Sequence, residues 1–335
     1  MIEVSGQQRN LITDVPGVAV GHADDVRIGS GVTAIIFAEP ATAVIDVRGG
    51  GPGTREGALL DPTNTVERID AIALSGGSAF GLDAASGVQA WLFERGRGFA
   101  VREARVPIVP GAILFDLLNG GDKNWGRFPP YRELGYAAAA AASADFALGS
   151  VGAGLGALTV SVKGGIGSAS ASVRGITIGA LAAVNPAGSV TIGDGPHFWA
   201  APFEQDGEFG GRGFPTSVPA DALVPRTKAS VREATTLALI ATDAGLTKAQ
   251  LKRVAVMAQT GMARAIYPVH TPLDGDVVFA ASTGARALFD PLLGLSELGS
   301  VAANVLARAI ARGVYEAKAL AFPAAQPSWR DKHGS

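Results

Sequence analysis

The sequence predicts a layered α/β fold, in which helices pack against sheets of short buried strands. Short apolar runs rich in β-branched residues, bounded by Gly, Pro or Asp, are intermixed along the chain with stretches of helical periodicity. Apolar residues make up 47% of the 335-residue chain, which is enough to build a large core. The 45 glycines stand in short clusters without a period of three, which indicates tight loops and excludes collagen.

The N-terminal third of the chain is expected to contribute buried strands and one helix. The strands are expected at residues 33–37, 42–47 and 71–74. A glycine-rich string follows the third strand directly. Apolar residues then recur at helical spacing from Leu82 to Leu92, which predicts a helix that ends near Gly96.

The middle of the chain is expected to hold a helix, further strands and a long irregular segment. The helix is expected over about 133–148, where alanines predominate. The strands are expected at 158–162, 171–184 and 189–192. Residues 199–234 lack any periodic pattern, and an irregular stretch of this length inside a compact domain is typically functional or disordered. We therefore expect 199–234 to be a flexible segment.

The last third is expected to alternate strands with helices. A strand is expected at 235–242 and another at 277–280. Between them, Thr247 and Gln250 form a capping box that opens an amphipathic helix. The final helix is expected to face inward along the residues between Val301 and Ile310.

Composition excludes several classes of protein. The formal net charge is −2 and no dense Lys/Arg run is interleaved with aromatic residues, so a nucleic-acid partner is not expected. Cysteine is absent, which excludes disulfides, thiol catalysis and cysteine metal sites. The first residues lack the pattern of a signal peptide, and the run of alanines at 137–142 is too short to cross a bilayer. We expect a cytoplasmic protein without a membrane partner.

No cofactor is expected from the motifs. Residues 152–157 match the dinucleotide pattern G-x-G-x-x-A, but an expected strand follows them where that motif requires a helix. The phosphate-binding motif G-x-x-x-x-G-K-[ST] and the nucleophile elbow G-x-S-x-G are both absent from the sequence.

The polar cluster at 270–276 has three interpretations. His270 with Asp274 and Asp276 could ligate a cation, although a further ligand nearby in the sequence is not evident. The Asp-Gly-Asp string could simply form a tight turn before the next strand. A carboxylate at a strand entrance could instead orient and polarise a nucleophile or its amine.

Two further residues are candidates for chemistry. Lys163 stands between an apolar run and the glycine-rich string 164–167, and glycine would let its ammonium approach a reacting centre to stabilise negative charge or to lower the pKa of an amine. A surface charge is the simpler interpretation. Asn185, followed by Pro186, either belongs to a turn or donates its amide to an oxyanion.

Thr235 is a candidate nucleophile because the long irregular segment lies directly upstream. If the chain were cut before Thr235, the new α-amino group, with an ordinary pKa near 8, could act as the base for the residue's own hydroxyl. One residue would then supply both groups in a chain with four histidines and no cysteine. A structural β-forming role is the alternative.

Six strings, in order along nearly the whole chain, resemble the L-aminopeptidase/D-esterase family, which includes β-peptidyl aminopeptidases and the nylon-oligomer hydrolase. These strings are residues 13–22, 46–54, 74–82, 151–154, 163–167 and 241–243. The resemblance implies an N-terminal-nucleophile hydrolase with an αββα sandwich. It implies one domain, 1–335, made as a precursor that cuts itself into fragments 1–234 and 235–335, which assemble as a homotetramer.

The resemblance also assigns roles to single residues. Thr235 lies where the family has its nucleophile, so cleavage is expected between Ala234 and Thr235. The Thr and the two carboxylates, Asp274 and Asp276, resemble the nylon-oligomer branch, whose catalytic Lys and Asn match Lys163 and Asn185.

Two residues depart from the pattern of that branch. Ala234 stands where the branch has Asn and other members have Gly, which bears on self-cleavage. Phe115 stands where Tyr is expected, which bears on a hydrogen bond to substrate or intermediate. With Gly164 and Gly165, Phe115 is expected to contact substrate.

The resemblance predicts an autoprocessing amidohydrolase that acts on linear amides of the nylon-oligomer (6-aminohexanoate) type, without cofactor or metal. One alternative is an aminopeptidase or D-aminoacyl esterase-amidase that acts on short peptides. A second alternative is a ligand-binding oligomer of the same fold in which Thr235 is only structural.

Overall fold

The computed structural model describes residues 9–228, 234–323 and 325–334. Within these residues a main sheet of nine strands is accompanied by a two-stranded hairpin and five α-helices. The main-sheet strands are β1 (Val18–Asp25), β2 (Ser30–Val47), β3 (Thr54–Arg55), β4 (Arg68–Ser75), β7 (Gly111–Ile113), β8 (Ile166–Val173), β9 (Ile176–Asn185), β10 (Thr235–Ala244) and β11 (Val277–Arg286). The hairpin is β5 (Phe99–Val101) with β6 (Ala104–Val106), and the helices are α1 (Ala84–Phe93), α2 (Tyr131–Ala140), α3 (Lys248–Ala265), α4 (Leu293–Tyr315) and α5 (Trp329–His333).

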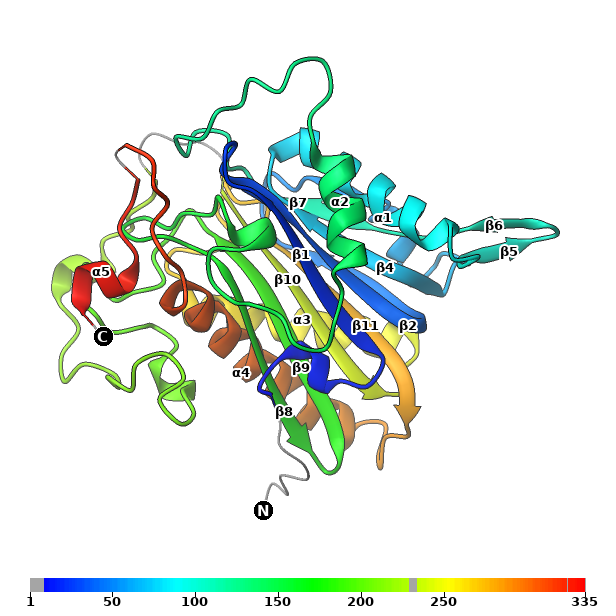
Figure 1. Ribbon diagram of the computed structural model, residues 1–335. Coiled ribbons are helices and arrows are strands. Elements are labelled where there is room, and N and C mark those ends of the chain that lie inside the picture. The colour runs from blue at the N-terminus through cyan, green and yellow to red at the C-terminus, as the bar shows by residue number, and fades with distance from the viewer. Residues whose placement is uncertain (1–8, 229–233, 324, 335) are drawn as a thin grey trace.

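The long strand β2 divides the main sheet into two layers. The strand order is β3-β7-β4-β2-β11-β10-β9-β8, and β1 pairs with β2 outside this path (Figure 1). Residues 30–37 of β2 pair with β1, whereas residues 42–47 pair with β11. The register against β4 shifts between Ile36 and Ala41, at an irregularity that includes Pro40. Each half of β2 therefore belongs to a different layer.

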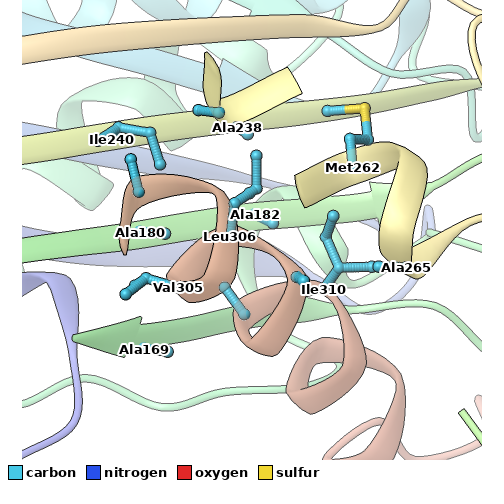
Figure 2. Packing of buried hydrophobic residues seen from close by; sticks show 14 of the residues in the cluster. Ala169, Ala180, Ala182, Ala238, Ile240, Met262, Ala265, Val305, Leu306 and Ile310 are labelled. Carbon is cyan, nitrogen blue, oxygen red and sulfur yellow. The ribbon is translucent and has the colours of Figure 1, made fainter. Parts of the chain in front are cut away.

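Three buried clusters show that the order of layers is αββα. Along β10, Leu237 and Leu239 point into the cluster between the two sheet layers, where they join Ile72 of β4. Ala238 and Ile240 point to the opposite face, against α3 and α4 (Figure 2). On the other layer, the second face of β2 and β4 packs against α1 and α2. The layered α/β fold predicted from the sequence is confirmed.

Helices α3 and α4 cover one sheet layer and lie close to each other. The predicted capping box opens α3, because the Gln250 N–H donates to Thr247 Oγ1 and the Thr247 N–H donates to Gln250 Oε1. A Cβ on Gly261 would lie 2.0 Å from the carbonyl oxygen of Ala303, so glycine permits the close crossing with α4. None of the described helices is long and apolar enough to span a bilayer.

Two strands expected from the sequence do not form. Residues 158–162 make a turn in which Thr159 Oγ1 donates to the Val162 carbonyl and accepts from the Val162 N–H. Residues 189–192 form only isolated bridges, and Ser189 Oγ likewise bonds both the N–H and the carbonyl of Thr191. In both segments a short hydroxyl side chain satisfies backbone groups that a strand would have paired with a neighbour.

Other boundaries differ from those expected. The helix expected over 133–148 is α2 and ends at Ala140, because the backbone of Ser143 then pairs with Val20 of β1. The two strands expected at 33–37 and 42–47 are parts of the single strand β2. The run 171–184 spans the turn between β8 and β9, where Gly175 has φ +78°.

The segment upstream of Thr235 contains neither a strand nor an α-helix over residues 199–228. Two short 3-10 helices, Ala201–Phe203 and Ala220–Leu223, interrupt this stretch, and Phe209 is buried against Phe198. Residues 229–233 of the segment that was expected to be flexible lie outside the described residues.

The core between the β8–β11 layer and α4 predicts a large effect for Leu306. Leu306 is fully buried beside Ala182, so Leu306→Ala should lower the free energy of unfolding by about 2–5 kcal/mol because it leaves a cavity (Figure 2). Leu292→Ala is the matched control: its side chain is 73% exposed and should cost less than about 0.5 kcal/mol. Guanidinium unfolding followed by tryptophan fluorescence measures both, and equal effects would contradict this packing.

Candidate active site

Thr235 is the first residue of β10, which lies between β9 and β11 inside the main sheet. Asn185, the last residue of β9, is its direct antiparallel partner. On the other side, Ala234 forms a parallel bridge with Asp274, just before β11. The start of a central strand therefore brings the predicted nucleophile, the predicted amide and the Asp-Gly-Asp string together.

The peptide bond between Ala234 and Thr235 is held firmly. The Ala234 carbonyl oxygen accepts the Gly275 N–H at 2.7 Å and the Thr235 hydroxyl at 2.6 Å. The Ala234 N–H donates to the Leu273 carbonyl at 3.0 Å. Two donors on one carbonyl polarise it, and the Thr235 hydroxyl lies next to the carbon that this carbonyl activates. Thr235 itself is buried.

The two predicted carboxylates hold the turn that supplies the Gly275 N–H. Asp274 accepts the Ala187 N–H on Oδ1 and both the N–H and the hydroxyl of Thr271 on Oδ2, all within 2.9 Å. Asp276 Oδ1 accepts the Thr236 N–H at 2.8 Å, and its Oδ2 contacts the N–H and the ring Nδ1 of His270. Burial raises the pKa of Asp276, and its hydrogen bond with His270 opposes this shift.

The interpretation of 270–276 as a tight turn describes the structure. The carboxylates of the turn also accept the backbone N–H of Thr236, next to Thr235, and that of Ala187, two residues after the end of β9. Among the described residues, no group of three or more His, Asp or Glu side chains is placed to hold a metal ion. The structure gives no support to the metal interpretation of this cluster.

Asn185, which pairs with Thr235 of β10, also contacts the other sheet layer. Its Nδ2 donates to the Phe115 carbonyl at 3.0 Å. Its Oδ1 accepts the Leu158 N–H and the Lys228 ammonium, both at 2.9 Å. Both partners of Oδ1 are donors, so the orientation of the amide is determined. The second N–H of Nδ2 has no hydrogen-bond partner among the described residues.

Two lysines lie near Asn185: Lys163 is fully buried and Lys228 is partly buried. Lys163 Nζ donates to the carbonyls of Gly154 and Gly164, and Lys228 Nζ donates to both Oδ1 and the carbonyl of Asn185. Burial lowers the pKa of each amine to about 7. Lys228 was not predicted as a site residue, because a lone lysine in an irregular segment carries no signal that separates it from a surface charge.

A pocket of about 250 Å³ opens beside Thr235, at the end of the core between the two sheet layers. Its wall is mostly apolar and comes from both layers, with contributions from Gly51, Pro52, Gly53, Ser78, Ala79, Leu82, Ile113, Phe115, Ala234, Thr235, Pro272 and Leu273. The predicted residue Phe115 is part of this wall. None of the described residues that line it carries a charge.

Six predicted site residues do not line this pocket. Three of them, Asn185, Asp274 and Asp276, lie beside the start of β10, and the other three are Lys163, Gly164 and Gly165. Gly164 and Gly165 are buried, and a Cβ there would lie 2.0 Å from the Val184 carbonyl oxygen and 2.5 Å from that of Gly313 respectively. These glycines serve close backbone packing. Lys163 borders a separate pocket of about 210 Å³ under the C-terminal segment.

Comparison with known proteins gives consistent matches over nearly the whole chain. Residues 10–326 match the family model for peptidase family S58. The chain is 43% identical over 345 residues to an uncharacterised aminopeptidase of Mycobacterium tuberculosis, covering 96% of this chain and 97% of the relative. It is 29% identical over 287 residues to a 6-aminohexanoate-oligomer endohydrolase of Kocuria sp., covering 82% of this chain and 76% of the relative.

Solved structures show the same fold. The L-aminopeptidase D-Ala-esterase/amidase of Ochrobactrum anthropi, described as a variant of the N-terminal-nucleophile hydrolase fold, superposes with a TM-score of 0.69 at 21% identity, covering 95% of this chain and 90% of its own. The PH0078 protein of Pyrococcus horikoshii superposes with a TM-score of 0.71 at 26% identity, covering 99% and 94%.

Proposed function

Since the chain belongs to peptidase family S58 and is therefore a hydrolase of peptide or amide bonds, we propose that it cuts itself between Ala234 and Thr235 and then hydrolyses amides with Thr235. The observation that carries the proposal is the Ala234 carbonyl, which accepts both the Gly275 N–H and the Thr235 hydroxyl. A carbonyl polarised in this way, with a hydroxyl beside it, is prepared for an N-to-O acyl shift.

After cleavage the free α-amino group of Thr235 takes up the hydroxyl proton as the hydroxyl attacks a substrate amide. The leaving amine receives that proton, and water then hydrolyses the ester on Thr235. The second N–H of Asn185 Nδ2 and the Gly275 N–H, which cleavage releases from Ala234, are the donors available to the oxyanion. Lys163 would tune the amine, and the two carboxylates would keep the strand ends in register.

The two fragments would remain one domain. Strands β10 and β11 belong to fragment 235–335, but they pair with β9 and β2 of fragment 1–234. Both fragments also contribute to the core clusters on the two faces of this layer. Separation would expose these cores, so the hydrophobic effect favours an associated pair of fragments.

The pocket favours a linear, uncharged acyl group as substrate. Its wall is mostly apolar and its described residues carry no charge, as suits an alkyl chain of an oligoamide, and the relative from Kocuria is named as an endohydrolase of such oligomers. A second candidate function is that of an aminopeptidase, because the relative at 43% identity carries that name. An aminopeptidase must recognise a free amino group, and the described residues of this wall include no carboxylate.

Denaturing mass spectrometry of the full-length protein tests the proposal. The wild type should separate into pieces of 234 and 101 residues, cut before Thr235. The variant Thr235→Ala lacks the proposed nucleophile and should stay intact and inactive. Thr236→Ala is the matched control and should be cut, because the buried hydroxyl of Thr236 has no partner in the described structure. A wild-type chain that hydrolyses amides while remaining intact would refute the scheme, and an intact chain without amidase activity would favour the ligand-binding alternative.

A capped substrate separates the two candidate activities. Linear 6-aminohexanoate oligomers with a free amino end and their N-acetylated counterparts would be compared by chromatography of the products. We expect the two forms to be hydrolysed at internal bonds with rates within about tenfold, since the described part of the wall has no carboxylate to bind an amine. Complete resistance of the capped form would instead identify an aminopeptidase.

Gly275→Ala should prevent self-cleavage without a change in any reacting group. A Cβ at this position would lie 2.6 Å from Thr235 Oγ1 and 2.8 Å from the Gly51 carbonyl oxygen, so the hydroxyl must move. A displacement of about 1 Å commonly costs about 100-fold in rate. Gly245→Ala, whose Cβ would meet its nearest neighbour at 3.5 Å, is the control and should be cut normally. Equal cleavage of both variants, followed by gel electrophoresis over time, would exclude a role for this close contact.

A further inference from the structure

Self-cleavage by Thr235, on which this inference rests, needs a base that Thr235 of the uncut chain cannot supply. In the mature enzyme the α-amino group of Thr235 would act as the base. Before cleavage that nitrogen is part of the Ala234–Thr235 peptide bond, where resonance with the carbonyl makes its lone pair unavailable. Another group must accept the hydroxyl proton in the uncut chain.

The carboxylates beside the bond are poorly suited to this task. Both oxygens of Asp274 and both oxygens of Asp276 already accept hydrogen bonds from N–H or hydroxyl groups. The His270 ring contacts Asp276 through Nδ1. These groups brace the turn around Gly275, and the hydrogen bond that the Thr235 hydroxyl makes in the described structure goes to the Ala234 carbonyl and not to any of them.

We propose that the Lys228 amine is the base of the self-cleavage step. Lys228 Nζ lies 2.9 Å from Oδ1 and 3.1 Å from the carbonyl oxygen of Asn185, which is the direct cross-strand partner of Thr235. Side chains of such partners share one face of the sheet, with Cβ atoms about 4.5–5.5 Å apart. The amine therefore lies on the side of the sheet that carries the Thr235 hydroxyl. The two groups share no direct hydrogen bond in the described structure, so the proton would pass through one water molecule.

The hydrogen bonds of Lys228 leave a lone pair for the proton. A neutral primary amine has two N–H bonds and one lone pair, and both N–H bonds can be donated to the two oxygens of Asn185. The lone pair then points away from Asn185. Burial favours this neutral form by lowering the pKa of Lys228 to about 7, whereas the charge of Asp274 opposes the shift. Burial lowers the pKa of the neighbouring Lys163 as well; the charge of Asp116 opposes this shift and the charge of Lys228 adds to it.

The step balances without a further reagent. The Thr235 hydroxyl proton passes to Lys228 Nζ while Oγ1 bonds to the Ala234 carbonyl carbon, and the Gly275 N–H holds the resulting oxyanion. The bond from that carbon to the Thr235 nitrogen then breaks, and the nitrogen takes the proton back from Lys228. Water hydrolyses the ester, which leaves a carboxylate on Ala234 and a free amine and hydroxyl on Thr235.

The position of Lys228 along the chain suits a role limited to processing. It precedes Ala234 by six residues, on the segment whose far end is released when the bond is cut. Lys163 differs because the carbonyls of Gly154 and Gly164 hold its amine and it borders the other pocket. After cleavage the α-amino group of Thr235 makes a second base unnecessary.

The test follows self-cleavage of the full-length chain, made by pulse-labelled cell-free translation, from about pH 6 to about pH 9. The wild-type rate should rise through about pH 7 as Lys228 loses its proton. Lys228→Met should slow cleavage by at least about 100-fold, as expected for loss of a general base. Lys228→Arg should be equally slow, because arginine keeps the donors to Asn185 but stays protonated.

These variants distinguish a Lys228 that only holds Asn185 in place from a Lys228 that accepts the proton. Arg226→Met, which removes exposed ion pairs of the same segment with Asp194 and Asp221, is the control and should be cut within about twofold of the wild type. Normal cleavage of Lys228→Met, or rescue by Lys228→Arg, would overturn the proposal.

Chemical rescue by added ethylamine tests whether Lys228 acts as a base, because a free amine could not replace a lysine whose role is only structural. Ethylamine should restore cleavage in Lys228→Ala by occupying the space of the missing amine, and failure to do so would also overturn the proposal. A wild-type chain that is never cut would instead refute the proposed function as a whole, so the two failures are distinguishable.

Discussion

The site depends on one constraint: Thr235 is the first residue of a strand that has neighbours on both sides. Because β10 lies between β9 and β11, the backbone around the Ala234–Thr235 bond is positioned by Asn185 on one side and by the turn at Gly275 on the other. An edge strand would leave one of these sides open to water. The central position also buries the bond, and in a water-poor environment the Gly275 N–H polarises the Ala234 carbonyl more strongly than it would in solvent.

The two-layer architecture explains why a pocket meets Thr235 at this point. Side chains alternate along β10, so Thr235 points to the same face as Leu237 and Leu239, which fill the core between the sheet layers. Thr235 stands where this core ends, and the opposite wall comes from the other layer through Ile113 and Phe115. The apolar character of the pocket thus continues the interior of the sandwich. Polarity is confined to the strand ends, where Asn185 reaches across to the Phe115 carbonyl.

Much of the fold could be predicted from local patterns, and the errors have a common physical origin. Periodicity located β10 and α3, and the capping box gave the start of α3, because these elements are long and bury one face. The expected strands at 158–162 and 189–192 failed where a single Thr or Ser hydroxyl outcompeted ladder pairing, an effect that apolar composition does not reveal. The continuity of β2 through Pro40 depends on which strands pair with each half, and pairing is not encoded locally.

The candidate site was predictable only in part for a similar reason. Thr235, Asn185, Asp274 and Asp276 could be named from the order of strings along the chain, and the structure brings them together. Lys228 could not be named, because its significance arises from burial against Asn185. Gly275 matters because its backbone N–H is a donor and because it has no side chain to displace Thr235. Every glycine in a turn has these two properties, so the sequence does not single out Gly275.

The distribution of these residues between the two halves of the chain also sets the order of events. Phe115, Lys163 and Asn185 precede the proposed cleavage point, whereas the turn that carries Gly275 follows it. The Gly275 N–H can reach the Ala234 carbonyl only after β10 has paired with β11, and Asn185 can reach Thr235 only after β10 has paired with β9. Those pairings bring together segments far apart in sequence, so they form with the fold itself and not in the nascent chain. Folding must therefore precede the proposed cleavage, and the proposed cut falls at the start of a strand, where it would remove no hydrogen bond from the interior of the sheet.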